Sequence, residues 1–425
     1  MRSWRLSIGV AAFGLIVGAT PFAFAQNAKE KVLHNFNTNK QDGIGPSGGL
    51  IFDAAGNLYG ETLRSHNAGF GAVFELTPSD NGFWTEAILH DFSYSDGVDP
   101  SGTLIFDTSG NLYGTTIAGG SGTGTGCSVR VGGCGTVFEL SPVAGGGWTE
   151  TVLYNFDHTN GANPRGGLVF DAGGNLYGTT YVGGGSYSST VGTVFELSPT
   201  AGGGWTKTVL HNFRDNHVDK DGVEPNGDLI FDAAGNLYGT TVGGGSDGFG
   251  TVFELSPQAD GSWKETVLYS FSAGGGGIQP NSGLVFDAVG NLYGTTQLGG
   301  THESSTVFEL SPALGGGWTE SVLYTFSNPN DGPAAEGSLV FDAAGNLYGA
   351  LSGSVGCNTD CGQIFKLSNS AGVWSETALF SFDSKNGAQP NGGLIFDAAG
   401  NLYGTTTAGG TKGAGTAFEI ALQIY

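Results

Sequence analysis

The sequence has little sulfur, few charges and very few basic residues. It contains 1 Met and 4 Cys among 425 residues, and only 12% of the residues are charged, where soluble domains carry about 25%. The 15 Lys and Arg residues are outnumbered by 38 Asp and Glu, which gives a formal net charge of −23. Such an acidic protein repels nucleic acids and anionic membrane surfaces, so we expect neither as a partner.

Long apolar runs are also missing after the N-terminal segment. That segment combines Arg2 and Arg5, an apolar run up to Phe24 and a small-x-small cleavage site ending at Ala25, which is the pattern of a secretory signal peptide. A retained membrane anchor is the alternative, but glycines and Pro21 interrupt the run. We predict a signal peptide over residues 1–25 and a mature chain over 26–425, exported to the periplasm or the extracellular space without membrane insertion.

Glycine is abundant instead. The chain has 79 Gly and 14 Pro, yet 39% of its residues are hydrophobic and 12% are aromatic, which is too many for a disordered protein. The single Met lies in the predicted signal peptide. A mature chain with Cys but no Met suits an oxidising compartment, so we expect a folded, exported protein with a hydrophobic core.

An internal repeat explains the glycine content. The segment Asp-x-x-Gly-Asn-Leu-Tyr-Gly lies in a unit that reads as four short strands separated by Gly, Pro, Asn and Asp. Its Asp and Gly predict a type I turn with a G1 bulge, in which Asp accepts backbone hydrogen bonds and Gly adopts a positive φ. The seven copies begin at Asp53, Asp107, Asp171, Asp232, Asp287, Asp342 and Asp397.

The two ends of the chain indicate how the repeats are arranged. Residues 31–36 form a lone strand of the fourth type, whereas the last unit stops after its third strand, at Ile420. The strand types balance only if the N-terminal strand completes the last unit, which closes a ring and leaves no sheet edge. We predict an all-β fold, a single seven-bladed β-propeller of four-stranded blades with glycines such as Gly48 near its axis. A parallel β-helix or an open solenoid is the alternative.

The repeat also resembles a known family. The string Gly-Asn-Leu-Tyr-Gly-Thr-Thr-x-x-Gly-Gly, followed by Gly-Thr-Val-Phe-Glu-Leu, recurs over nearly all of residues 31–422. It is similar to the GloVer-type tandem repeat of exported bacterial "choice-of-anchor" proteins. The resemblance implies bacterial export and propeller-like repeats, and it brings no catalytic residues to this chain.

Residues that recur with the repeat are assigned to the scaffold. A Glu occupies the third strand of six blades, and a Trp opens six of the fourth strands; we interpret both as packing residues of the blade. Three fourth-strand histidines occupy a position that Tyr or Phe holds in the other blades, and we interpret them as packing residues too. These histidines are His34, His90 and His211.

Variable loops give the candidate binding surface. In an up-and-down blade, the loops between the second and third strands (2–3 loops) lie on the same face as the links between blades, and both vary in length. Binding residues concentrate on variable loops of a rigid frame, and a His beside a carboxylate can act as a base or bind a metal. The alternative is that the polar residues on these loops are ordinary solvated residues that bind nothing. The candidate ligand-binding residues, which break the repeat, are Glu61, Arg64, His66, His158, Arg165, Arg214, His217, Asp219, His302 and Glu303.

The cysteines and the known motifs predict disulfides but no cofactor. Cys127 pairs locally with Cys134, and Cys357 with Cys361, so we predict two loop disulfides in an exported protein. Neither pair has zinc-site spacing, and the turn lacks the alternating oxygen ligands of a calcium loop. Nucleophile-elbow, zinc-protease and phosphate-loop motifs are missing from the sequence. We therefore predict no metal, no cofactor and no catalytic residues.

Three functions fit these features. We favour an exported, monomeric, non-catalytic propeller that binds or scaffolds a glycan, peptide or protein on the face of the 2–3 loops and links. The alternatives are an extracytoplasmic hydrolase or lyase that acts on a polymer at the channel mouth, and a structural module of the envelope. Converging acids and bases would favour the enzyme, and a large apolar patch would favour the structural module.

Overall fold

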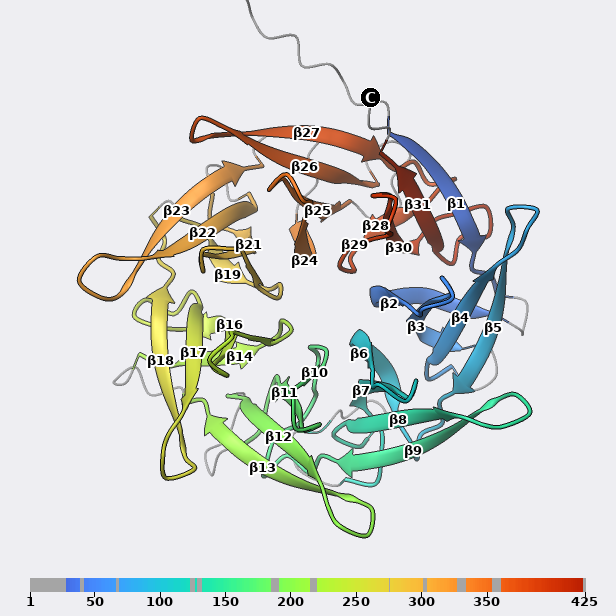
Figure 1. Ribbon diagram of the computed structural model, residues 1–425, viewed down its shortest axis with the longest axis horizontal. Helices are drawn as coiled ribbons and strands as arrows, with labels where there is room; N and C mark the ends of the chain where they lie inside the picture. The colour runs from blue at the N-terminus through green and yellow to red at the C-terminus, as the bar shows by residue number, and fades with distance from the viewer. Residues whose placement is uncertain are drawn as a thin grey trace, which may run out of the picture.

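The computed structural model describes residues 28–38, 42–65, 69–122, 127, 132–184, 191–214, 220–274, 276–300, 304–326, 334–353 and 361–422. Within these ranges the secondary structure is all-β, and the strands form seven sheets arranged in a ring (Figure 1). The prediction of a seven-bladed propeller is confirmed. No helix long and apolar enough to cross a membrane occurs in the described part of the chain.

The first three blades follow one another in chain order, and each runs from the axis to the rim. Blade 1 contains β2 (Gly43–Phe52), β3 (Leu58–Ser65), β4 (Ala72–Pro78) and β5 (Trp84–Asp91). Blade 2 contains β6 (Val98–Phe106), β7 (Leu112–Ala118), β8 (Thr136–Pro142) and β9 (Trp148–Asn155). Blade 3 contains β10 (Val169–Phe170), β11 (Leu176–Thr180), β12 (Thr193–Pro199) and β13 (Trp205–Asn212).

The next three blades repeat this order, but in blades 4 and 5 the innermost strand is divided into two short strands. Blade 4 contains β14 (Gly222–Pro225), β15 (Ile230–Phe231), β16 (Leu237–Gly244), β17 (Thr251–Pro257) and β18 (Trp263–Ser270). Blade 5 contains β19 (Ile278–Pro280), β20 (Val285–Phe286), β21 (Leu292–Leu298), β22 (Thr306–Pro312) and β23 (Trp318–Thr325). Blade 6 contains β24 (Ala334–Phe341), β25 (Leu347–Ser352), β26 (Gly362–Ser370) and β27 (Val373–Ser381).

Blade 7 joins the two ends of the chain. It contains β28 (Ala388–Pro390), β29 (Ile395–Phe396), β30 (Leu402–Ala408) and β31 (Thr416–Ala421), and its outer strand is β1 (Lys29–Asn35). β1 pairs antiparallel with β31, with Lys31 opposite Glu419 and Asn35 opposite Thr416. The N-terminal strand therefore closes the ring as predicted, and Figure 1 shows the blue β1 beside the red β31.

The predicted turn geometry is present in every blade. In blade 1 the Asp53 carboxylate accepts the N–H groups of Ala55 and Asn57, each at 2.8 Å, and Gly56 has φ +89°. The Asn57 side-chain amide donates to the second carboxylate oxygen at 2.8 Å. One Asp thus fixes the turn and the residue directly before the next strand, which explains why the motif couples Asp to Asn.

Glycines at the axis allow the innermost strands to approach closely. A Cβ on Gly48 would lie 1.8 Å from the carbonyl oxygen of Gly102 in the next blade, and a Cβ on Gly392 would lie 2.0 Å from that of Gly48. Pairing of β2 with β3 is interrupted between Ser47 and Ile51. At these glycines a side chain would collide with the backbone of the neighbouring blade.

Phenylalanines hold neighbouring blades together. Phe92, at the end of β5, is fully buried and packs edge-to-face on Phe138 of β8 in the next blade, with ring centroids 5.0 Å apart. Its backbone N–H donates to the carbonyl of Gly71. The tryptophans also pack between blades, as Trp148 does against Tyr59 at 6.2 Å, which agrees with their predicted scaffold role.

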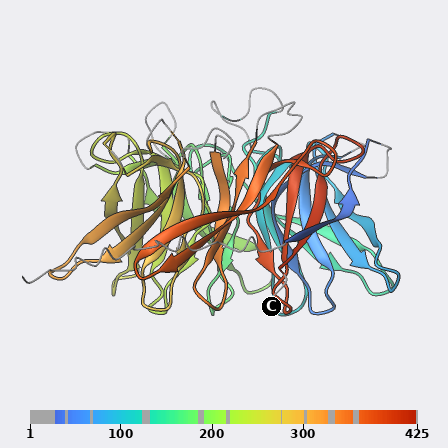
Figure 2. The same ribbon diagram turned by 90° about the horizontal axis from the view of Figure 1, so that it is seen from above.

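The links and the 2–3 loops share one face of the ring. The N–H of Asp99 in the strand that follows one link donates to the carbonyl of Phe70 in the preceding 2–3 loop, and Gln279 contacts Phe249 in the same way. Figure 2 shows the ring from the side, with loops gathered on two opposite faces. Each link is therefore fastened to the preceding blade at the same edge as the 2–3 loops.

Candidate functional site

The innermost strands surround a pocket in the central channel. Its volume is about 240 Å³, and residues from the first strand or link of all seven blades line it, together with Leu63 of β3. Leu63 lies where β3 leads into the 2–3 loop. The pocket thus reaches toward the face of the loops and links, where the sequence placed the binding surface.

The polar lining of this pocket departs from the repeat. At the residue before the first-strand Leu, four blades have Gly, whereas Thr103, Asp228 and Ser338 stand in the other three. Two positions earlier the pocket is lined by Ser or Asn in five blades and by Arg165 in blade 3. These five are Ser47, Ser101, Asn226, Asn281 and Asn391.

Asp228 reaches from blade 4 toward two other blades. Its carboxylate accepts the N–H of Gly167 at 2.5 Å and the hydroxyl of Thr103 at 3.3 Å. Burial inside the ring raises the pKa of Asp228, although both hydrogen bonds oppose that rise. The carboxylate is fixed in the channel by groups from blades 2 and 3.

Arg165 is held by an aromatic ring. Its guanidinium carbon lies 3.5 Å from the centroid of Tyr181, and its Nη1 lies 3.5 Å from Oδ1 of Asn226. Buried side-chain atoms without a hydrogen-bond partner among the described residues include Nε of Arg165 and Oδ1 of Asn391. The pocket therefore contains one unmet donor and one unmet acceptor.

Glu61 lies beside this channel, between blades 1 and 2. It stands where five other blades have Thr, it is 2% exposed, and neither carboxyl oxygen has a hydrogen-bond partner among the described residues. A Cβ on Gly114 of β7 would lie 2.9 Å from its Oε1. Burial, and then the charge of Asp228, raise the pKa of Glu61 well above its ordinary value.

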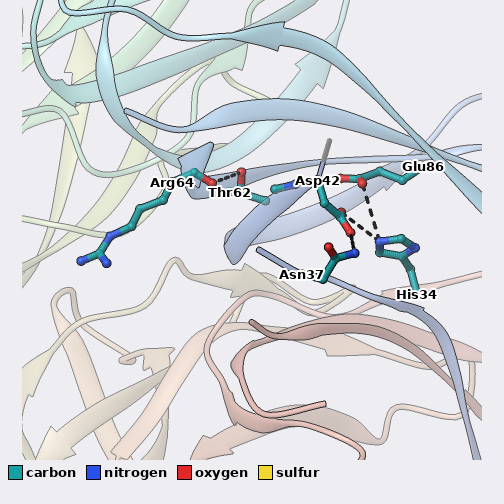
Figure 3. A network of polar contacts seen from close by, with 7 residues as sticks. His34, Asn37, Asp42, Thr62, Arg64 and Glu86 are labelled. Carbon is teal, nitrogen blue, oxygen red and sulfur yellow. Dashed lines mark hydrogen bonds and ion pairs between the residues drawn. The ribbon is translucent and has the colours of Figure 1, made fainter. Parts of the chain in front are cut away.

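A second group of polar side chains lies at the junction between blades 7 and 1. Nε2 of His34 in β1 lies 3.1 Å from Oδ1 of Asp42 in the link and 3.6 Å from Oε2 of Glu86 in β5 (Figure 3). Burial, and then the neighbouring Asp42, raise the pKa of Glu86 to about 9. The pKa of Asp42 is lowered, because hydrogen bonds with His34 and Glu86 outweigh burial.

The same three residue types recur at the junction of blades 1 and 2. His90 in β5 lies 3.4 Å from Oδ2 of Asp96 in the link, and Glu150 of β9 completes the group. Nε2 of His90 and Oε1 of Glu150 are buried and have no hydrogen-bond partner in the described part of the chain. Burial lowers the pKa of His90, and burial followed by the charge of Asp96 raises that of Glu150 to about 7.

A third, more open copy lies between blades 3 and 4. His211 of β13 lies 3.1 Å from Oδ2 of Asp221, and Glu265 of β18 faces them across a hollow of about 500 Å³. The N–H of Arg214 donates to Asp221 at 3.1 Å. Our interpretation of the fourth-strand histidines as packing residues was incomplete. Each does pack on a Phe, but its ring nitrogen faces an Asp.

Comparison with known families agrees with the repeat pattern. A family model described as the Gloeobacter/Verrucomicrobia repeat matches residues 9–214, 123–327 and 264–424, in overlapping segments that span nearly the whole chain. The chain belongs to this repeat family. The resemblance noted in the sequence is confirmed. The comparison with curated proteins returned no match.

Solved structures similar to this repeat protein include two enzymes. A luciferin-regenerating enzyme is 14% identical, with a TM-score of 0.45 over 81% of this chain and 96% of that one. A gluconolactonase from Xanthomonas campestris is 15% identical, with a TM-score of 0.42 over 92% and 100%. A protein of unknown function from Dyadobacter fermentans is 12% identical, with a TM-score of 0.43 over 93% and 100%. At these identities the names of those proteins say nothing about the activity of this repeat protein.

The structure describes half of the predicted ligand-binding residues. Arg165 lines the channel pocket, and Glu61 is buried between blades 1 and 2. Arg64 is exposed at the end of β3, His158 lies in the link before blade 3, and Arg214 lines the outer hollow. Figure 3 shows the Arg64 side chain directed away from the His34 group. The described residues thus do not gather at one centre. The others lie outside the described residues: His66, His217, Asp219, His302 and Glu303.

The disulfide prediction is supported within the described residues. Cys127 and Cys134 form a disulfide, with a sequence separation of 7. Cys361 is also disulfide-bonded, whereas Cys357 lies outside the described residues. A bridge across so short a segment restrains its own 2–3 loop more than the whole ring.

Sequence reasoning missed Asp228 and the Asn residues of the channel. The repeat motif lies at the turn after the first strand, whereas these residues lie at the axis, before the first-strand Leu. Aligning the copies on the first-strand Leu gives Gly, Thr, Gly, Asp, Gly, Ser and Gly at the preceding position. That pattern is the signal that singles out Thr103, Asp228 and Ser338.

Proposed function

We propose that this protein is an exported, non-catalytic β-propeller that binds a small, hydroxyl-rich ligand, such as the terminal unit of a glycan, in its channel pocket. The observation that carries the proposal is the pair of buried, unmet polar atoms at the pocket, Nε of Arg165 and Oδ1 of Asn391. Buried polar groups are almost always paired, so such atoms call for a partner that both donates and accepts hydrogen bonds.

The size and composition of the pocket support this ligand class. At about 240 Å³ it is smaller than the 300–1,000 Å³ of typical pockets for drug-sized molecules. Its described lining includes hydroxyl and amide groups from several blades, the guanidinium of Arg165 and the carboxylate of Asp228. A polyol can satisfy such a mixed set, whereas an extended peptide or a protein surface would not fit inside the ring.

The alternative functions have weaker support. A hydrolase would use the two buried carboxyls, Glu61 and Asp228, as acid and base. However, Glu61 faces Gly114 between blades and is not among the residues that line the pocket. A structural module needs a large apolar patch, but exposed apolar side chains such as Phe83, Val143 and Leu314 lie at the tips of hairpins in separate blades.

Binding to sugars tests the proposal. We would titrate the purified protein with neutral monosaccharides, sugar acids and short oligosaccharides in a calorimeter. The Arg165→Ala variant should bind the best of these at least tenfold more weakly, because a hydrogen bond to a charged group contributes about 1.5–3 kcal/mol. Arg214→Ala, outside the channel, is the matched control.

Two results would reject the binding role. The first is that no saccharide binds wild type at millimolar concentration, or that Arg165→Ala binds as well as wild type does. The second is release of shorter sugars from an oligosaccharide that stops in Glu61→Gln, which would establish the hydrolase in place of the binding protein.

A further inference from the structure

Two junctions, that of blades 7 and 1 and that of blades 1 and 2, each contain three side chains that suit a metal ion. In each set one His, one Asp and one Glu direct a ligand atom inward, and the three atoms lie within 4.8 Å of one another. The sets are His34, Asp42, Glu86 and His90, Asp96, Glu150. We propose that each of these two junctions binds one divalent transition-metal ion, and that Zn²⁺ is the representative ion.

The spacing of the donor atoms fits this ion. In a tetrahedral site with bonds of about 2.0–2.1 Å, neighbouring donors lie about 3.3 Å apart. Nε2 of His34 is 3.1 Å from Asp42 Oδ1 and 3.6 Å from Glu86 Oε2, so two of the distances already bracket that value. One imidazole and two carboxylates leave the fourth position to water. An imidazole in the set favours zinc and its neighbours over calcium or magnesium, which prefer oxygen donors alone.

Neighbouring groups already orient the ligands. The Asn37 side-chain amide donates to the outer oxygen of Asp42, and the N–H of Gly43 donates to Oε1 of Glu86 at 3.3 Å. These contacts leave Oδ1 of Asp42 and Oε2 of Glu86 directed at His34 (Figure 3). The side chains of Asp42 and Glu86 are only 5% and 6% exposed. Two carboxyls buried side by side gain from a cation between them.

An independent observation comes from the second junction. Nε2 of His90 and Oε1 of Glu150 are both buried and lack a hydrogen-bond partner among the described residues. Nε2 of His90, although 3.4 Å from Oδ2 of Asp96, and Oε1 of Glu150 therefore both lack a well-formed hydrogen bond at this junction. A metal ion would satisfy both, as a neutral imidazole and a carboxylate are the forms that bind it.

The other junctions show what the same position does without histidine. At the junction of blades 4 and 5, Tyr269 replaces the His, and its hydroxyl hydrogen-bonds to Glu320. At that of blades 2 and 3, Tyr154 and Lys207 occupy the positions of His and Glu, and the Lys207 amine donates to the Asn160 carbonyl. Tyrosine and lysine thus provide protein partners at those junctions, although Oε1 of Glu320 and Oδ1 of Asn160 still lack a hydrogen bond among the described residues.

The site at His34 lies where a bound ion would stabilise ring closure. His34 belongs to β1, the strand that closes the ring, while Asp42 and Glu86 belong to the link and to blade 1. An ion at this junction ties the closing strand to the next blade. Because it binds the folded ring and not the unfolded chain, it raises the melting temperature in proportion to the logarithm of its concentration.

Calorimetric titration of the untagged, EDTA-treated protein with ZnCl₂ tests the proposal. We expect His34→Tyr and His90→Tyr each to lose one bound Zn²⁺ per chain, and the Zn²⁺-dependent rise in melting temperature to shrink with each loss. Tyrosine is the residue that other blades carry at this position, so the fold should persist, and circular dichroism checks it. His158→Gln, a link histidine outside both sets, is the control and should bind as wild type does.

Two outcomes would overturn the proposal. One is the absence of both Zn²⁺ binding heat and a Zn²⁺-dependent melting shift in the wild-type protein. The other is a double variant, His34→Tyr with His90→Tyr, that folds and binds the same number of Zn²⁺ ions as wild type. CaCl₂ titrated in parallel should give at least tenfold weaker binding, and tighter binding of Ca²⁺ than of Zn²⁺ would contradict the donor argument.

Discussion

Glu61 should make the stability of the protein fall as the pH rises. The side chain is 2% exposed, its oxygens have no hydrogen-bond partner among the described residues, and burial together with Asp228 raises its pKa. A raised pKa means that the folded protein keeps this proton at pH values where the unfolded chain has lost it. The resulting stabilisation is fully present below the unfolded pKa of about 4.3 and is lost as the pH rises toward the folded pKa.

The linkage relation gives the size of the effect. Each pH unit between the two pKa values changes the free energy of unfolding by about 1.36 kcal/mol per proton. The contribution of the Glu61 proton therefore falls over the pH range in which the unfolded chain has lost the proton and the folded protein still holds it. Substitution by Thr removes this loss and restores a hydroxyl. In blade 2 the equivalent Thr115 donates to the carbonyl of Ser101 at 2.9 Å.

Urea unfolding at pH 5, 6 and 7 measures the effect. The free energy of unfolding of Glu61→Thr, minus that of wild type, should grow at each step of this range, by up to about 1.36 kcal/mol per pH unit. Glu61→Gln, which keeps the size of the side chain, should show the same trend. Asp80→Asn, at an exposed position in the turn after β4, is the control and should follow wild type. Parallel curves for wild type and both Glu61 variants would refute the reasoning.

Three further predictions concern the scaffold. Phe92→Ala should lower the free energy of unfolding by about 3–5 kcal/mol in urea, because Phe92 is fully buried between blades, whereas Phe83→Ala at a 70% exposed tip should change it by less than about 0.5. Gly110→Ala should cost about 1–2 kcal/mol, since φ is +87° although space is free, and calorimetry of Gly110→Asn should show a smaller loss. Deleting residues 29–35 should expose the edge of β31 and give oligomers in gel filtration, and a monomer that melts like wild type would contradict ring closure by β1.

The scaffold could be predicted from the sequence because every structural requirement is repeated seven times. The Asp-x-x-Gly turn, the glycines near the axis and the unpaired fourth-type strand at residues 31–36 each point to the same ring. Local chemistry decides these features. The positive φ of Gly56 and the bonds of Asp53 involve residues within one short segment, so no tertiary contact could overrule the prediction.

The candidate sites were only partly predictable because their residues come from different blades. Arg165 was singled out since its charge breaks the repeat, but Asp228 was not, although its carboxylate contacts Gly167 and Thr103. His34 and Asp42 are close in sequence, whereas Glu86 belongs to the next blade. A sequence search that looks for ligands in one segment cannot find such a set.

Within-chain comparison could have found the junction sets. Each of the three fourth-strand histidines is followed by an Asp placed directly before the Gly that begins the next blade, and that blade carries Glu two residues after its Trp. Where Tyr154 and Phe380 replace the His, the link residue is Asn160 or Asn386. The scaffold needs neither the His nor the Asp, since those two blades form the same strands without them.

Burial separates the informative departures from the uninformative ones. Arg64 and Arg214 also break the repeat, but both side chains are exposed, and solvation is enough to explain them. Glu61 differs from them, because its carboxyl is buried inside the ring, where burial raises its pKa and where the hydroxyl of Thr would be more stable. Since five other blades carry Thr at this position, the blade fold does not require the carboxyl of Glu61, and its buried, unpartnered oxygens mark it as a departure that solvation cannot explain.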